Sequence, residues 1–139
     1  MNLELKATKI QFIYDDGDTN AINFTLDDNG YFSIQNGVYL EEDDDLNQPI
    51  FEYKDQGHSQ SGGIEGIVFG KRIILLNFKN SDLFLEKYKT TELLLNQSVD
   101  RKTVDFFANH LFLGDYIQYD KNFEDSNKVA QTKYREPLS

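Results

Sequence analysis

Apolar and polar residues alternate along the first half of the chain, and this pattern predicts short β-strands. The segment Leu3–Tyr14 carries apolar side chains at alternate positions, and the phase changes around Thr8–Lys9, which indicates a bulge. Alternating segments follow at Ala21–Leu26, Tyr31–Gln35 and Pro49–Asp55. Turns rich in Asp, Asn and Gly separate the first three segments, so we expect a meander of antiparallel strands.

The most apolar part of the chain is the segment 64–78. Two apolar runs, Ile64–Phe69 and Arg72–Phe78, are separated only by Gly70–Lys71, which predicts a β-hairpin. Apolar residues at consecutive positions indicate burial on both faces, so we place this hairpin near the centre of the sheet. The segment just before it, Gln56–Ser61, is polar and is expected to be a loop.

The strongest helix pattern is Ser98–Leu113. Ser98 is a suitable N-cap, apolar residues follow at helical spacing, and Gly114 is a suitable end. A shorter helix is predicted within Asn80–Lys89, and Thr91–Asn96 is a further strand candidate.

One amphipathic helix after several strands predicts an α+β fold. We expect an antiparallel sheet of short strands with a central hairpin at about 64–78 and a C-terminal amphipathic helix at about 99–113 packed on one face. Residues 1–120 would form a single domain, with a late edge strand at Tyr116–Tyr119, and residues 121–139 a polar tail.

The formal net charge of −10 comes from the N-terminal half. From Tyr14 to Asp55 there are 12 acidic residues and one basic residue, a net of −11, and the remainder carries 12 acidic and 13 basic residues, a net of +1. Such a surface repels nucleic acids and membranes and attracts basic partners. The chain has no cysteine, no long apolar segment and no N-terminal signal pattern, so we expect a cytoplasmic protein.

Patterns for catalysis, metal binding and cofactor binding are weak. Asp55, His58 and Ser61 have the residue types of a hydrolase triad, but they crowd into one short segment and no G-x-S-x-G elbow is present. Asp15–Asn20 resembles half of a calcium loop, but its glycine comes too early for an EF-hand. Gly62–Gly63 precedes a strand and lacks the Walker spacing, so positive backbone angles or a close approach explain it better. We therefore expect no enzyme activity, metal or cofactor.

The order of motifs resembles the immunity protein 10 family of bacterial polymorphic toxin systems. Tyr31-Phe32-Ser33-Ile34-Gln35 is similar to the family's Y-L-x-L-Q strand, and the acidic run Glu41–Asp45 and Ile50-Phe51-Glu52-Tyr53 follow in the family's order. Gly62-Gly63-Ile64-Glu65 is similar to its G-G-I-E motif, although Ser61 stands where the family often has an aromatic residue. The resemblance implies a small cytoplasmic protein that is not an enzyme and that binds and inhibits a cognate toxin.

Two polar segments are the candidate contact sites for such a toxin, which we expect to be basic. The first comprises Glu41, Glu42, Asp43, Asp44 and Asp45, and the second comprises His58, Ser59, Gln60 and Ser61. The motif Gly62, Gly63, Ile64 and Glu65 is assigned a structural role. Two alternatives remain open: an acidic nucleic-acid mimic that inhibits DNA- or RNA-binding proteins, and a small hydrolase that uses the segment 55–61.

Overall fold

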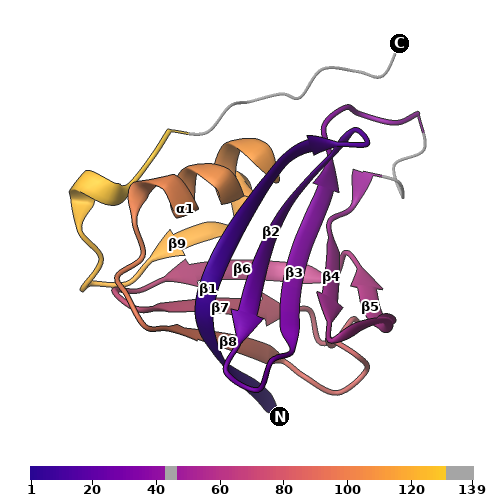
Figure 1. The fold of residues 1–139 in the computed structure, drawn as a ribbon, viewed down its shortest axis with the longest axis horizontal. Helices are drawn as coiled ribbons and strands as arrows, with labels where there is room; N and C mark the ends of the chain where they lie inside the picture. Colours follow the sequence, from indigo (N-terminus) through magenta and orange to yellow (C-terminus); the bar gives the residue numbers. More distant parts are fainter. Residues whose placement is uncertain (43–46, 131–139) are drawn as a thin grey trace.

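A computed structural model describes residues 1–42 and 47–130 of the chain. Within them the strands form one nine-stranded mixed sheet, in the order β5-β4-β3-β2-β1-β8-β7-β6-β9 (Figure 1). The strands are β1 (Asn2–Asp16), β2 (Thr19–Leu26), β3 (Tyr31–Gly37), β4 (Ile50–Tyr53), β5 (Asp55–Ser61), β6 (Ile64–Phe69), β7 (Ile73–Phe78), β8 (Thr90–Leu95) and β9 (Ile117–Tyr119).

The long strand β1 joins the two halves of this sheet. Its first residues pair in parallel with β8, from Asn2 opposite Thr90 to Ala7 opposite Leu95. From Ala7 onward β1 also pairs antiparallel with β2, beginning with Ala7 opposite Leu26. The register shifts between Ala7 and Lys9, which confirms the predicted bulge. Strands β6 to β8 run across the direction of β1 to β5 in Figure 1. The two halves therefore face each other across a shared interior.

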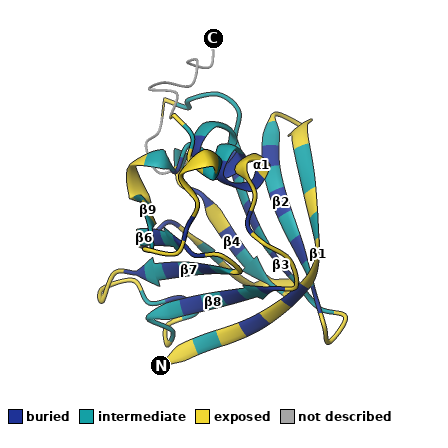
Figure 2. Ribbon diagram, turned by 90° about the vertical axis from the view of Figure 1, so that its left-hand side faces the viewer, coloured by how far each residue is buried: buried dark blue, intermediate teal, exposed yellow. Residues whose placement is uncertain are grey.

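The core lies on the inner face of both halves. Buried and half-buried residues alternate strictly along β2, β3, β7 and β8, as the banding in Figure 2 shows. Aromatic rings from opposite halves meet there: the Phe51 and Phe78 ring centroids are 5.2 Å apart, and those of Phe32 and Phe84 are 5.8 Å apart. Burial of such large side chains contributes about 2–3 kcal/mol each relative to exposure.

The predicted α+β class is wrong, because the described part of the chain is mostly β. Strands make up 48% of it and helical residues only about 13%. The predicted helix at 99–113 is shorter: α1 spans Arg101–Asp105 and continues as one π-helical turn, Phe106–His110. Its N-cap is Asp100, whose carboxylate accepts hydrogen bonds from the backbone N–H and the hydroxyl of Thr103, and not Ser98. This segment closes one end of the core with Phe106 and Phe107 and does not form a layer over the sheet.

The predicted hairpin at 64–78 exists, but its place in the sheet was wrong. Strands β6 and β7 pair antiparallel, yet they lie close to the β9 edge, and β1 occupies the centre. The outward side chains, such as Val68 and Leu75, are half-buried and not buried. The consecutive apolar residues of β6 and β7 therefore reflect one buried face and one partly covered face of the sheet.

Two further segments differ from the prediction. Gln56–Ser61 belongs to the edge strand β5 and is not a loop, because its backbone pairs with β4 despite its polar side chains. Asn80–Lys89 contains turns and a bridge between Phe84 and Tyr88 instead of a helix. The strands predicted at 91–96 and 116–119 are confirmed as β8 and β9.

The glycine pair has the backbone geometry that the sequence suggested. Gly62 and Gly63 have φ angles of 70° and 85°, in the left-handed region. A Cβ atom on Gly63 would lie 2.7 Å from the Gln60 amide nitrogen and 3.0 Å from the Asp82 carbonyl oxygen. Both conformation and space therefore require glycine at position 63.

We expect Gly63→Ala to lower the free energy of unfolding by about 3 kcal/mol, from backbone strain together with the steric clash. Gly17→Ala is the matched control, because Gly17 also has a positive φ of 60° but no atom within 4 Å of the added Cβ. The control should cost about 1 kcal/mol, from strain alone. Urea unfolding of both variants measures the difference, and equal losses would contradict the close-packing argument.

Candidate partner-binding surface

Acidic side chains from two segments gather at one end of the β1–β2 hairpin. The end of β1 and the turn after it carry Asp15, Asp16 and Asp18. The Val38 N–H donates to the Asp18 carbonyl (2.9 Å), which holds the chain after β3 beside the turn. That stretch continues to Glu41 and Glu42. We call Asp15, Asp16, Asp18, Glu41 and Glu42 the acidic end. The predicted contact residues Asp43, Asp44 and Asp45 lie outside the described residues.

A groove of about 370 Å³ lies at the acidic end, and both acidic segments contribute to it, through Asp18 and Glu41. The remaining lining residues are Gly17, Thr19, Gln35, Asn36, Gly37, Gln48 and Ile50. Carboxylates from both segments therefore line one groove.

The acidic turn is held by buried amides. Asn20 is 5% exposed; its Oδ1 accepts the Asp15 N–H (2.7 Å), and its Nδ2 donates to the His110 carbonyl (3.0 Å) at the end of the π-helical turn. Asn36 on the neighbouring strand donates to the Leu111 carbonyl in the same way (2.9 Å). These bonds fix the backbone from which the carboxylates project.

The three aspartates of this turn carry unneutralised charge. The side chains of Asp15, Asp16 and Asp18 are exposed and make no hydrogen bond or ion pair with the parts of the chain that the structure describes. Asp15 and Asp18 have positive φ angles of 48° and 63°, which Asp tolerates better than most residues. Within residues 1–42 and 47–130, the turn therefore presents like charges to solvent without a compensating cation.

Two large apolar side chains are exposed near the acidic end, Tyr14 on the face of the sheet that packs on the helical segment and Ile50 on the opposite face. Tyr14, the residue before the turn, is 50% exposed, and Ile50, which lines the groove, is 37% exposed. The Tyr14 ring packs edge-on against Phe106 and His110, with centroid distances of 5.2 and 5.1 Å. Apolar anchors bordered by polar groups are the usual arrangement of protein–protein interfaces.

The second acidic turn, Asp27–Asp28, lies at the other end of β2 and differs in its electrostatics. Asp28 pairs with Lys54 at 2.9 Å. The hydrogen bonds from Lys54 and from the Gly30 backbone N–H lower the pKa of Asp28, and the bond to Asp28 raises the pKa of Lys54. The negative charge of this turn is partly neutralised, so the turn attracts a basic partner less strongly than the acidic end does.

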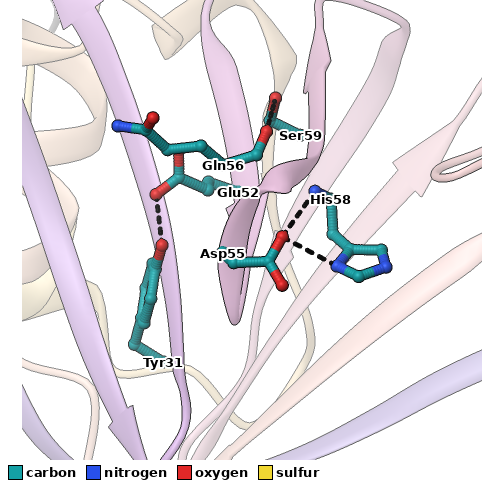
Figure 3. A network of polar contacts seen from close by, with 6 residues as sticks. All are labelled: Tyr31, Glu52, Asp55, Gln56, His58 and Ser59. Atoms are coloured by element: carbon teal, nitrogen blue, oxygen red, sulfur yellow. Dashed lines mark hydrogen bonds and ion pairs between the residues drawn. The ribbon is translucent and has the colours of Figure 1, made fainter.

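The predicted contact residues His58, Ser59, Gln60 and Ser61 all lie on β5. In Figure 3 the His58 ring faces Asp55, with Nδ1 2.9 Å from the carboxylate, whereas the Ser59 hydroxyl donates to the Gln56 carbonyl (3.0 Å). The His58 ring makes no hydrogen bond to a serine among the described residues. The arrangement needed for the hydrolase alternative is therefore not assembled on this strand.

A depression of about 390 Å³ does open beside His58. It is lined by Tyr53, Lys54, His58, Leu85, Lys87 and Tyr88. Two tyrosine rings and a leucine form its apolar walls, and the lysine ammonium groups lie over the rings, Lys54 at 5.2 Å from the Tyr53 centroid and Lys87 at 5.1 Å from that of Tyr88. Without a nucleophile facing His58, this depression is suited to holding a side chain more than to acyl transfer.

The remaining predicted residues have structural contacts. Gln60 links β5 to the loop between β7 and β8, because its Nε2 donates to the Asp82 carbonyl (3.0 Å) and its Oε1 accepts the Leu85 N–H (3.1 Å). In the motif after the strand, Ile64 is buried and Glu65 pairs with Lys89 at 2.7 Å.

The fold brings only one end of β5 towards the acidic end. Ser61 lies opposite Ile50 in the β4–β5 ladder, whereas His58 lies near Lys54 in the depression described above. Sequence reasoning missed Tyr14 and Ile50 as surface residues. For Ile50 a signal was present, because it shares a strand face with Glu52 and Lys54.

Comparison with protein-family models, curated proteins and solved structures gives no match for this chain. The resemblance to immunity protein 10 stays a prediction from short motifs. No cluster of three metal-ligating side chains occurs within residues 1–42 and 47–130. In those same residues no helix has both the length and the apolar character needed to cross a bilayer.

The pair of Tyr31 and Glu52 provides a pH-dependent test of the site geometry. The Tyr31 hydroxyl donates to the Glu52 carboxylate at 2.5 Å (Figure 3), and this bond raises the pKa of Tyr31 to about 12. Because the folded-state pKa lies above the ordinary value of 10.0, the neutral phenol stabilises the fold fully below pH 10.0, and that contribution is lost as the pH rises through about 12.

We expect Glu52→Gln to lower the pKa of Tyr31 towards its ordinary value, measured by following the tyrosine ring resonances through an alkaline titration. Glu4→Gln, which removes an exposed carboxylate on β1, is the control and should leave that pKa unchanged. An unaltered Tyr31 titration in Glu52→Gln would contradict the assigned hydrogen bond.

Proposed function

We propose that this protein is an immunity protein of the bacterial cytoplasm, which binds a cognate toxin and inhibits it by protein–protein contact. The observation that carries the proposal is the acidic end, where carboxylates without a partner among the described residues lie beside exposed Tyr14 on one face of the sheet and exposed Ile50 on the other. The motif order of residues 31–113, which resembles immunity protein 10, supports the same function.

The two kinds of side chain have different roles in binding. The carboxylates attract a basic toxin surface and raise the association rate, since long-range electrostatic attraction acts before contact. The apolar side chains act after contact, because their burial slows dissociation. The buried amides of Asn20 and Asn36 hold the turn in place, so little conformational entropy is lost on binding.

An acidic nucleic-acid mimic would use the same carboxylates in a different way. It would bind any basic nucleic-acid channel by charge, without depending on Tyr14. The exposed apolar anchors favour a specific protein partner, and binding to several unrelated nucleases distinguishes the two functions. A specific immunity protein should inhibit only its cognate toxin.

We expect the triple variant Asp15→Asn, Asp16→Asn, Asp18→Asn to associate about tenfold more slowly with the toxin domain encoded beside this protein, and with a weaker dependence on salt. Asparagine keeps the size of the side chain and tolerates the left-handed backbone of this turn. Tyr14→Ala should instead increase the dissociation rate by about tenfold or more. Surface plasmon resonance at several salt concentrations measures both rates.

The matched control removes three exposed carboxylates elsewhere, through Glu4→Gln, Asp27→Asn and Glu124→Gln. It changes the net charge equally, from −10 to −7, so a specific acidic end predicts a clearly smaller effect on association. Equal slowing in both triple variants would show that net charge alone drives encounter and would count against the proposed surface. Growth of a bacterial host that expresses the toxin reports inhibition independently.

A further inference from the structure

The strand β5 is an edge of the sheet and exposes part of its backbone. Strand β5 stands at one end of the strand order, and β4 is its only neighbour among the described strands (Figure 1). Three residue pairs form its regular ladder with β4: Ile50 with Ser61, Phe51 with Gln60, and Glu52 with Ser59. These pairs fix which backbone groups face β4 and which face outward.

The direction of each backbone group follows from one hydrogen bond. The Gly62 N–H donates to the Pro49 carbonyl at 2.8 Å, so these directly opposed residues form a hydrogen-bonded pair. Hydrogen-bonded and non-hydrogen-bonded pairs alternate in an antiparallel ladder. Gln60 therefore bonds to Phe51, whereas the N–H and C=O groups of Ser59 and Ser61 point away from β4. No backbone hydrogen bond from Ser59 or Ser61 to the described chain is present on that outer side.

Within the described chain, the shape of β5 limits the outward-facing, unpaired backbone to Ser59–Ser61, which we call the template. The register shifts between Glu52 and Tyr53, which leaves Gln56, Gly57 and His58 without partners on β4. Such bulges prevent further strands from adding along an edge. Ser59–Ser61 carries no bulge, charge or proline, the devices that usually protect edge strands.

A depression next to this template is suited to a side chain. His58 from β5 forms part of the 390 Å³ depression, whose apolar walls are Tyr53, Leu85 and Tyr88. Gln60 holds the opposite wall in position through its bond to the Leu85 N–H. Extended peptides that add to a sheet edge use main-chain bonds for affinity and neighbouring pockets for specificity.

We propose that β5 is a docking edge on which an extended segment of the toxin adds as a tenth strand, through main-chain hydrogen bonds to Ser59 and Ser61. The segment places one apolar or aromatic side chain against Tyr53, Leu85 and Tyr88. An extended polypeptide is the occupant because it presents N–H and C=O groups at the same two-residue repeat as the edge. A second copy of this chain is disfavoured, since pairing would bring together two molecules of net charge −10.

This inference rests on the proposed function and adds to it a second contact of a different kind. Ser61 adjoins Ile50, which lines the groove of the acidic end, so one partner can reach both surfaces. The acidic end acts through charge and depends on salt. The β5 edge acts through the backbone, so its contribution to binding is insensitive to salt.

The test compares Ser61→Pro with Ser61→Ala. Proline removes the outward N–H and leaves the β4 ladder intact, because that N–H makes no bond to β4, whereas alanine removes only the hydroxyl. With the toxin domain as the probe, we expect Ser61→Pro to weaken binding at least about tenfold and Ser61→Ala to bind within about twofold of the unaltered protein. Circular dichroism and the thermal midpoint establish that both variants are folded.

Amide hydrogen exchange tests the same contact without a substitution. In the free protein the Ser59 and Ser61 amides should exchange fast and the Gln60 amide slowly, and in the complex all three should be slow. If the toxin binds but Ser61→Pro binds normally and the two serine amides still exchange fast, the docking edge is overturned while the proposed function stands. If the unaltered protein does not bind the toxin domain at all, both are overturned.

Discussion

The double pairing of β1 is the constraint on which the rest of the structure depends. Its first residues bond β8 in parallel and its later residues bond β2 antiparallel, so a single strand belongs to both halves of the sheet. A parallel partner cannot arrive through a tight turn. The chain therefore completes β2 to β7 before β8 returns beside the N-terminus, and the Phe51–Phe78 contact then forms between the two halves.

This arrangement also determines the surface chemistry. It places the β1–β2 turn against the end of the helical segment, where Asn20 binds the His110 carbonyl and leaves the turn's carboxylates facing solvent. At the opposite end the β2–β3 turn meets Lys54, and Asp28 is neutralised there. Strand β5 ends the sheet with β4 as its only described strand neighbour, so the backbone groups of Ser59 and Ser61 face outward.

Local sequence patterns correctly predicted the strands in which one face of side chains is buried. Alternation of apolar and polar residues marked β1 with its bulge, as well as β2 and β3, since one buried face requires that period. Prediction failed at β5 and at the 80–89 segment. The polar side chains of β5 carry no strand signal, because the ladder with β4 creates the strand, and residues 80–89 are turns fixed partly by Gln60 from that strand. The predicted α+β class failed for a related reason: the helical segment covers only one end of the core.

The sequence by itself determined the acidic character of the N-terminal half, the turn region after Tyr14 and the special backbone conformation of the pair Gly62–Gly63. These depend on residue type and local backbone conformation. Only the tertiary structure decided that Asp28 is paired while Asp15, Asp16 and Asp18 have no partner among the described residues, and that Tyr14 and Ile50 are exposed. Charge is a property of composition, but neutralisation and exposure depend on which distant segments become neighbours, and the pairing of β1 with both halves of the sheet sets those neighbours.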